Sequence, residues 1–149
     1  MQEVTVVTDG SCIGNPGPGG WACILRCENQ EREMSGSHDD TTSNRMELMA
    51  AIEALRALKT PCHVRLVSDS MYLKKGISEH LPKWKANSWI KANGEPVLNQ
   101  DLWDQLDQLA QKHEIQWEWT AGHADHADQN RADQLALQAA RAQAAQRQE

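Results

Sequence analysis

The sequence predicts an α/β protein with a five-stranded mixed sheet flanked by helices. Three β-rich runs separated by turns come first, at Glu3–Thr8, Trp21–Cys27 and Glu31–Gly36, and predict an antiparallel meander. Apolar residues then recur at helical spacing, before two further β-rich runs at His63–Asp69 and Ile115–Thr120. A strand reached through a helical crossover favours parallel pairing. The predicted sheet therefore has three antiparallel strands followed by parallel ones.

The segments between these strands have equally clear local signals. Glycines and prolines fill Ser11–Gly20, which predicts a turn. Leucine and isoleucine at helical spacing predict a helix from Asn44 to Leu58, ended by Pro61. The later segments are a helix at Ser70–Glu79, short pieces on a surface protrusion at Leu81–Leu98, a helix at Asn99–His113, a polar loop at Ala121–Asp128 and a last helix from about Gln129.

Length and composition limit the domain organisation and the cellular compartment. The chain has 149 residues, which suits one domain spanning 1–149, with about 143–149 expected to fray. Its four cysteines form no CxxC pair, so zinc is not expected, and the same-parity pair Cys23 and Cys27 is expected to be buried. We find no apolar N-terminal signal or long apolar span, and expect a cytoplasmic monomer without a membrane or an obligate protein partner.

Four carboxylates stand in separate local contexts that predict a metal site. Asp9 and Asp69 end β-rich runs, Glu47 lies on the helix between them, and Asp133 lies on the last helix. Because ligands bind at the carboxyl ends of strands in open α/β sheets, Asp9 and Asp69 are expected to converge there. Aspartates at neighbouring strand ends would repel one another without a cation between them. Oxygen ligands favour Mg²⁺, with Mn²⁺ as an alternative.

Each of these acids also has a purely structural interpretation. Asp9 with Gly10 could form only a turn, Glu47 could close a capping box opened by Asn44, and Asp69 could cap a helix. An acid in the first turns of a helix is expected from the helix dipole, so Asp133 is the weakest of the four on its own. The convergence of the other three favours the metal site.

A basic segment interrupts this acidic chain, whose net charge is −6. Between residues 74 and 91 five lysines face one acid, Glu79, so the segment carries a net charge of +4. Two tryptophans, Trp84 and Trp89, are interleaved with the lysines. Local basic charge beside aromatic surface is typical of nucleic-acid binding, whereas the overall charge opposes it. The alternative is a solvated helix with two core tryptophans.

Six motifs follow one another along the chain: TDGSCIGNPGPGGWACIL, NRMELMAAIEAL, SDS, W-K-x-x-x-W, DLWDQLD and WEWTAGHADHADQNRAD. In this order and at these intervals they resemble the type 1 ribonuclease H family. The resemblance covers nearly the whole chain. It implies a ribonuclease H-like fold and an endonuclease that hydrolyses the RNA strand of RNA–DNA hybrids with two metal ions, leaving 5′-phosphate and 3′-hydroxyl ends. The glycine-rich turn lacks the GK[ST] ending of a phosphate-binding P-loop, so nucleotide triphosphate binding is not expected.

The resemblance also implies roles for particular residues. Asp9 would bridge two ions, with Glu47 and Asp69 completing the ligands of one and Asp133 those of the other. His123, ten residues before Asp133, would assist proton transfer or product departure. The expected substrate contacts are Cys12, Asn15, Thr42, Asn44, Lys74, Lys75, Lys83, Trp84, Lys85 and Trp89.

The chain departs from the family pattern at positions near these motifs. Met71 replaces a frequent glutamine, which puts a minor-groove contact in doubt, and His80 replaces a frequent tryptophan. Asp125 and Gln129 replace a glycine and an asparagine around His123, so this loop's role could differ. Three rival classes share the fold or the acidic site. A polynucleotidyl transferase or resolvase usually lacks the glycine-rich turn and the basic protrusion, and the protrusion and the chain length argue against a fragment of a reverse transcriptase. A non-enzymatic hybrid-binding module is excluded because all four acids are present.

Overall fold

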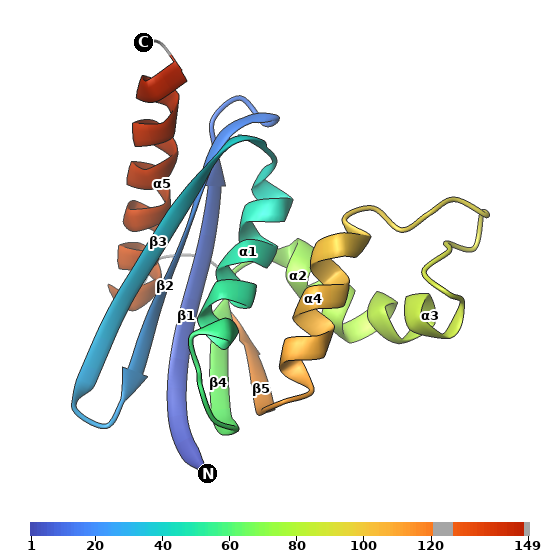
Figure 1. Cartoon of the computed structure of the whole chain (residues 1–149), viewed down its shortest axis with the longest axis horizontal. Coiled ribbons are helices and arrows are strands. Elements are labelled where there is room, and N and C mark those ends of the chain that lie inside the picture. The colour runs from blue at the N-terminus through green and yellow to red at the C-terminus, as the bar shows by residue number, and fades with distance from the viewer. Residues whose placement is uncertain (121–126, 148–149) are drawn as a thin grey trace.

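The computed structural model describes residues 1–120 and 127–147 and contains a five-stranded sheet with the strand order β3-β2-β1-β4-β5 (Figure 1). β1 pairs antiparallel with β2, β2 antiparallel with β3, and β4 lies parallel to both β1 and β5. The predicted mixed sheet is confirmed. The strands are β1 (Gln2–Cys12), β2 (Gly17–Cys27), β3 (Gln30–Thr41), β4 (Cys62–Ser68) and β5 (Glu114–Trp119).

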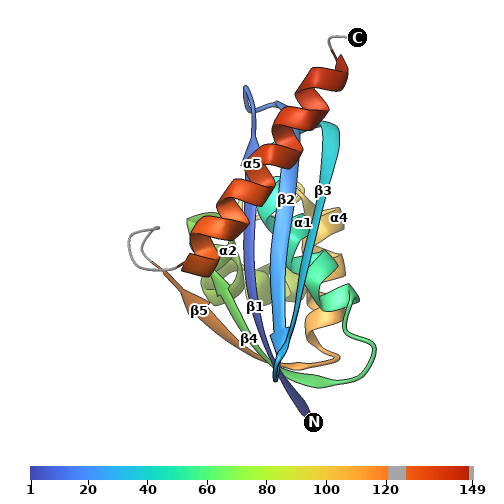
Figure 2. The same cartoon turned by 90° about the vertical axis from the view of Figure 1, so that its left-hand side faces the viewer.

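Helices cover both faces of this sheet. Helix α5 lies across β1, β2 and β3 on one face of the sheet (Figure 2). Helix α1 packs against β1 and β2 on the other face, and α4 packs against α1. The helical elements are α1 (Ser43–Arg56), α2 (Met71–Lys75), the π-helical turn η1 (Gly76–His80), α3 (Leu81–Ala86), α4 (Gln100–Ala110) and α5 (Ala127–Arg147).

The sheet separates a large apolar core from a small one. On the α1 side, Val6, Leu66 and Ile52 belong to a cluster that extends to the fully buried Trp103 of α4. On the α5 side, the neighbouring strand residues Val7, Ile24 and Val67 meet Ala132. Alternate side chains of a strand point to opposite faces, so β1 and β4 are buried on both sides. Their carboxyl ends are therefore held by packing from two directions.

The small second core depends on glycine and alanine. Ala132, Ala136 and Ala140 follow one another at four-residue spacing on α5 and are fully buried. A Cβ atom on Gly20 of β2 would lie 2.3 Å from the carbonyl oxygen of Ala136. The absence of a side chain at Gly20 therefore lets α5 rest directly on the backbone of β2.

The predicted turn was too long, and the first three predicted strands were too short. β1 continues to Cys12 and β2 already begins at Gly17, so the connection covers only residues 13–16 rather than Ser11–Gly20. The glycines were interpreted as turn residues, but they belong to the paired strands: Gly19 and Gly20 pair with Cys12 and Ser11 of β1. β3 extends to Thr41 instead of ending at Gly36, because it pairs along almost the whole length of β2.

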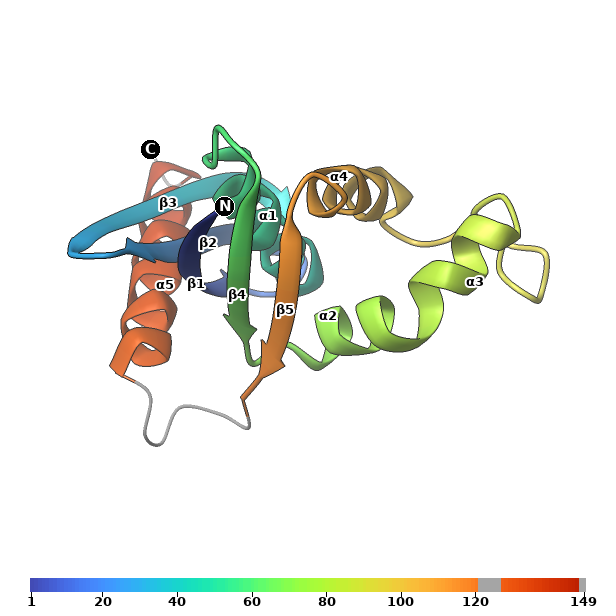
Figure 3. The same ribbon diagram turned by 90° about the horizontal axis from the view of Figure 1, so that it is seen from below.

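The predicted breaks in the protrusion were also partly wrong. α2, η1 and α3 follow one another without a gap from Met71 to Ala86, and this helical segment extends away from the sheet (Figure 3). Pro82 lies in the first turn of α3, directly after the π-helical turn η1, so the residue that lacks an N–H donor stands where π-helical hydrogen bonding changes to α-helical. Irregular backbone begins only after Ala86, with positive φ angles at Ser88 and Trp89.

Two predictions about side-chain faces are confirmed. Trp117 and Trp119 stack with their ring centroids 5.8 Å apart and pack with Ile115 against the large core. Cys23 is fully buried and Cys27 is half-buried against the same core, and both are free thiols. Among the residues that the structure describes, no helix is both long and apolar enough to cross a membrane.

Candidate active site

Three of the four predicted carboxylates converge at the carboxyl ends of β1 and β4. One ligand oxygen from each of Asp9, Glu47 and Asp69 lies within 4.8 Å of the other two. We call these residues the acid trio. Asp9 lies near the end of β1 and Asp69 directly follows β4, whereas Glu47 projects from the first half of α1. Asp9 and Glu47 are buried and Asp69 is partly exposed, so the trio opens to solvent on the side of Asp69.

The absence of a side chain at Gly10 lets Glu47 come close to Asp9. A Cβ atom at Gly10 would lie 2.5 Å from the backbone nitrogen of Glu47 and 2.6 Å from the carbonyl carbon of Met46. Helix α1 therefore touches the backbone of β1 at the residue after Asp9. The Gly10 N–H also donates to Asp9 Oδ1 and Glu47 Oε1, at 2.9 Å each, and this shared donor holds one oxygen of each carboxylate.

The purely structural interpretations of Asp9, Glu47 and Asp69 do not match the observed contacts. Thr42 caps α1 by accepting a hydrogen bond from the Arg45 N–H, and Ser70 caps α2 by accepting one from the Leu73 N–H. Neither cap uses Glu47 or Asp69. Gly10, the residue after Asp9, lies inside β1 rather than in a turn. Helix capping and turn formation therefore do not explain why these acids stand at this position.

Burial and repulsion from neighbouring charges make Asp9 and Glu47 reluctant to ionise. Burial raises the pKa of Asp9 far above that of an ordinary aspartate, and the neighbouring charges of Glu47 and Asp69 raise it further. Burial likewise raises the pKa of Glu47, with the charges of Asp69 and Asp133 acting in the same direction. A carboxylate cluster with these properties binds either protons or cations at neutral pH.

The unused oxygens of the site fit a divalent cation. Asp9 Oδ2 and Glu47 Oε2 are buried and accept no hydrogen bond from any residue that the structure describes. Buried carboxylate oxygens without partners are costly, and a cation would satisfy both. The ligand set consists of oxygens alone, which is the preference of Mg²⁺, Ca²⁺ and Mn²⁺.

Asp133 approaches the trio from the other face of the sheet. It lies on α5, is partly exposed and stands within hydrogen-bonding reach of Asp9. It does not join the trio's compact group of ligand oxygens. Asp9 thus lies between two sets of carboxylates, with Glu47 and Asp69 in one set and Asp133 in the other.

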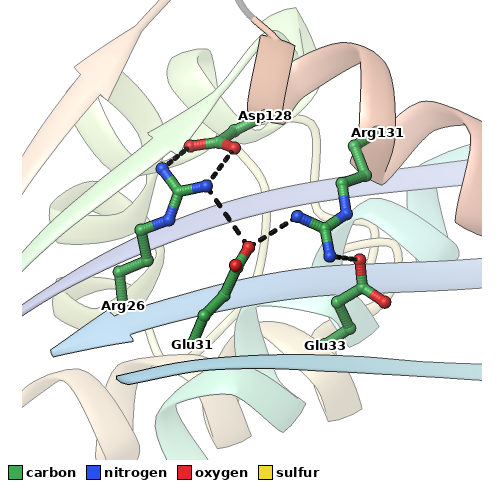
Figure 4. A network of polar contacts seen from close by, with 5 residues as sticks. All are labelled: Arg26, Glu31, Glu33, Asp128 and Arg131. Carbon is green, nitrogen blue, oxygen red and sulfur yellow. Dashed lines mark hydrogen bonds and ion pairs between the residues drawn. The ribbon is translucent and has the colours of Figure 1, made fainter. Parts of the chain in front are cut away.

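An ion network fixes the first turns of α5 to the sheet (Figure 4). Arg26 of β2 makes a two-pronged contact with Asp128, at 2.5 and 2.7 Å, and also contacts Glu31 of β3. Arg131 of α5 pairs with Glu31 and with Glu33. The sequence analysis missed this network because its members lie about a hundred residues apart in the chain.

The predicted substrate contacts near the turn hold α1 in place. Asn15 Oδ1 accepts a hydrogen bond from the Ser43 N–H at 3.0 Å, beside the Thr42 cap. Cys12 Sγ lies 3.5 Å from the Gly17 carbonyl oxygen and 3.4 Å from that of Thr41. Asn44 is partly exposed in the first turn of α1. The contact of these residues with a nucleic acid stays a prediction.

Two of the predicted basic residues, Lys75 and Lys83, line a pocket of about 600 Å³ on the protrusion, together with Lys91. Its apolar lining includes Tyr72, Trp84, Ile90 and Leu98. Lys74 and Lys85 are also exposed, although Lys85 Nζ pairs with Asp107 at 3.0 Å.

The tryptophans of the protrusion are only partly available for stacking. Trp84 packs edge-on against Trp103 at 5.5 Å and stacks on His80 at 5.3 Å, and Trp89 packs against the large core. His80, which departs from the family pattern, thus packs against Trp84. Met71, another departure from the family pattern, is 61% exposed. The departure at Asp125 and the predicted catalytic residue His123 both lie outside the described residues.

This mixed sheet with carboxylates at the ends of β1 and β4 defines an α/β protein with an acidic site suited to divalent cations. The RNase H family model matches residues 1–141. The chain is 54% identical over 143 residues to the Ribonuclease H of Solibacter usitatus (strain Ellin6076), covering 96% of this chain and 98% of that one. It is 57% identical over 136 residues to the Ribonuclease H of Cupriavidus necator (strain H16), covering 91% and 94%.

Solved structures share the fold as well. A crystal structure of a type 1 RNase H with the type 2 active-site motif superimposes with a TM-score of 0.87 at 32% identity, covering 96% of this chain and 74% of that chain. The chain belongs to the RNase H family. The resemblance predicted from its motifs and the predicted class of enzyme are both confirmed.

Proposed function

We propose that the chain is an endonuclease that hydrolyses the RNA strand of RNA–DNA hybrids by a two-metal-ion mechanism, leaving 5′-phosphate and 3′-hydroxyl ends. The observation that carries this proposal is the acid trio, with two buried carboxylate oxygens that no described residue satisfies. Family membership supports the reaction class, because relatives 52–57% identical are named Ribonuclease H. The same relatives disfavour a transferase, a resolvase or a non-enzymatic binding module.

The residues divide the work between two metal positions. Glu47 and Asp69 would hold one Mg²⁺ with Asp9, and Asp133 would hold the other with the same aspartate; Mn²⁺ could replace either ion. When bound, the two ions activate the attacking water and stabilise the leaving oxygen of an in-line displacement. Gly10 keeps Asp9 and Glu47 oriented through its shared N–H, so the ligands need little rearrangement on binding.

The protrusion supplies the positive charge that the rest of the chain lacks. We propose that Lys74, Lys75, Lys83 and Lys85 contact phosphates of the hybrid and that the exposed parts of Trp84 and Trp89 provide apolar or stacking surface. The turn residues Cys12 and Asn15, together with Thr42 and Asn44, would contact the two strands near the trio, where the 2′-hydroxyl distinguishes RNA from DNA. His123 is proposed to assist proton transfer or product departure. A monomeric state and a cytoplasmic location stay predictions.

Parallel cleavage assays test the proposed function. Labelled RNA–DNA hybrid, double-stranded DNA and double-stranded RNA are incubated with the protein, with and without Mg²⁺, and the product ends are mapped. We expect cleavage of the RNA strand of the hybrid alone, only with metal, and fragments carrying 5′-phosphates. Cleavage of the DNA strand, or equal cleavage of double-stranded RNA, would contradict the proposed substrate.

A further inference from the structure

Asp133 is the one proposed ligand whose position depends on the docking of α5. Asp9 belongs to β1, and Asp69 follows β4, which pairs with β1 along its length. Glu47 is tied to Asp9 through the Gly10 N–H. Asp133, in contrast, lies in the second turn of a helix that rests across the sheet (Figure 2). A small slide of α5 along β1 would change the distance from Asp133 to Asp9 and leave the trio as it is.

We propose that Gln129 is a positioning residue, which sets Asp133 relative to Asp9 through a hydrogen bond from its side-chain amide to the backbone of β1. The proposal rests on the proposed function, in which Asp133 and Asp9 share a metal ion. It goes beyond that function by assigning a role to a residue that touches neither metal ligand oxygens nor substrate.

The position of Gln129 is the first support. Its side chain is fully buried, and its Nε2 donates to the Thr8 carbonyl oxygen at 3.1 Å. Thr8 is the residue before Asp9, and it lies just beyond Val7, the last residue of β1 that pairs with β4. Gln129 stands one helical turn before Asp133, and residues four apart share a helix face. One hydrogen bond thus joins the segment that carries Asp133 to the segment that carries Asp9.

The packing of α5 is the second support, because the apolar contacts alone do not fix its register. The buried residues that follow Gln129 at this interface are the small residues Ala132, Ala136 and Ala140. The backbone at Ala136 and Ala140 lies directly on Gly20 of β2, and Ala132 packs against Val7, Ile24 and Val67. Helix backbone that lies on a glycine, flanked by a single methyl group at Ala132, gives a close contact with no long side chain to fix the position along the helix axis. A directional hydrogen bond from a buried side chain supplies the missing constraint along the helix axis.

The ion network of Figure 4 cannot replace this hydrogen bond. Its members Arg26 and Asp128 have side chains that are 45% and 26% exposed, so water and salt weaken their attraction. The network also joins α5 to β2 and β3, not to β1. Gln129 is the buried polar tie between α5 and β1 among the described residues, and it is therefore expected to keep its effect at high salt.

The test removes the donor and preserves the shape of the side chain. Gln129 Oε1 accepts no hydrogen bond from a described residue, so Gln129→Met loses the amide donor without breaking a second contact. We expect kcat on a hybrid substrate to fall by roughly 10- to 100-fold, as for other residues that orient a metal ligand. KM should stay within about twofold of the parent value, since the substrate-binding surface is untouched.

Metal binding gives a readout that does not depend on turnover. Isothermal titration with Mn²⁺ should show a Kd that is about tenfold weaker for one of the two ions in Gln129→Met, and an unchanged Kd for the other. In an Asp133→Asn background, which removes the ligand that Gln129 is proposed to position, adding Gln129→Met should have no further effect on Mn²⁺ binding. This non-additivity separates action through Asp133 from a general loss of structure.

Two matched variants complete the design. Ala140→Gly weakens α5 three turns away from Gln129 and serves as the stability control, while Gln138→Leu changes an exposed glutamine of the same helix. The inference is overturned if Gln129→Met binds both ions and turns over like the parent. It is also overturned if Ala140→Gly, at an equal loss of Tm, loses as much kcat. A parent protein that neither cleaves hybrid nor binds Mn²⁺ would instead refute the proposed function.

Discussion

The acidic site and the basic protrusion are built on opposite principles. The acid trio lies between two apolar cores, where Asp9 is only 3% exposed and Glu47 only 8%, and packing from both faces holds charges that would otherwise separate. The protrusion carries its lysines on exposed helical turns beyond the sheet (Figure 3). Rigid burial suits groups that must keep a fixed geometry against repulsion, whereas exposed and adaptable charges suit contact with a phosphate backbone.

This contrast predicts that changes in the two regions affect different kinetic constants. Changes at the trio should act on the chemical step, since they alter the groups that are proposed to hold the catalytic metal ions. Changes on the protrusion should act on binding that the ground state and the transition state share.

The largest effect is expected from Asp9→Asn, which removes the charge between the two proposed metal positions. Turnover should fall more than about a hundredfold in Mg²⁺, because stabilisation of charge by bound metal lowers the barrier by several kcal/mol. Hybrid binding, measured without turnover in Ca²⁺, should be largely retained. Asp104→Asn on α4, outside the trio, is the matched control. Turnover above about a hundredth of the parent value would refute the bridging role of Asp9.

Gly10→Ala should disturb the site through the backbone rather than through charge. The added methyl group would press on the Glu47 nitrogen at 2.5 Å, so α1 must move away from β1. We expect a loss of about 1–3 kcal/mol in the free energy of unfolding, typical of overpacking, together with a fall in kcat. Gly94→Ala is the comparison: nothing lies within 4 Å of the added methyl group, but φ is +88°, so this variant should lose stability through backbone strain and keep its kcat. An unchanged kcat in Gly10→Ala would show that the Gly10 contact does not set the position of Glu47.

The acidic site and the protrusion also differ in how well the sequence predicted them. The parallel pairing of β1 with β4 followed from their own residues and from the helical crossover between them. The meeting of Asp9 with Asp69 was therefore predicted from local signals, although β1 continues past its predicted end to Cys12. Gly10 was interpreted as a possible turn residue because its closeness to α1 is a tertiary contact that no sequence period reveals. Gln129 was noticed only as a departure from a family pattern. Its hydrogen bond to Thr8 joins residues 121 positions apart.

The protrusion was predicted less well, for a related reason. Proline and asparagine predicted breaks at Leu81–Leu98, yet η1 and α3 continue the helix of α2. Trp84 and Gly76 help to hold this continuation, because a Cβ atom at Gly76 would lie 2.0 Å from the ring of Trp103. Local breaking signals were thus overridden by packing against one buried tryptophan.

Replacing Lys83 and Lys85 together with alanine should raise KM for the hybrid by about tenfold and leave kcat nearly unchanged. Each lost phosphate contact should reduce the slope of log K against log salt by roughly 0.7–0.9. Lys83 should account for more of the change, because Lys85 is paired with Asp107. The double replacement of Lys59 and Lys112, which lie away from the protrusion, is the control. A salt slope equal to that of the parent would place the hybrid-binding surface elsewhere.

The smallest effect is expected on the pH dependence of stability. It tests whether burial of the charged carboxylates of Asp9 and Glu47 destabilises the metal-free protein. The pKa values of Asp9 and Glu47 are raised in the folded protein, first by burial. Folding therefore takes up protons at pH values above the ordinary carboxyl range, from about pH 4 upward. Over that interval the free energy of unfolding of the metal-free protein should fall as the pH rises. A tenfold difference in proton affinity between the folded and unfolded states corresponds to about 1.4 kcal/mol.

Two comparisons isolate the trio from the other charges of an acidic protein. Asp9→Asn should be more stable than the metal-free parent at pH 8, and the difference should shrink towards pH 4, where the parent carboxyl groups hold their protons. Saturating Mg²⁺ should stabilise the parent at pH 8 more than Asp9→Asn, because a cation satisfies the same unpaired oxygens. Urea unfolding at several pH values measures both effects. If Asp9→Asn were less stable than the metal-free parent across this range, Asp9 would be a structural group, and the contrast between a strained buried site and a relaxed exposed one would fail.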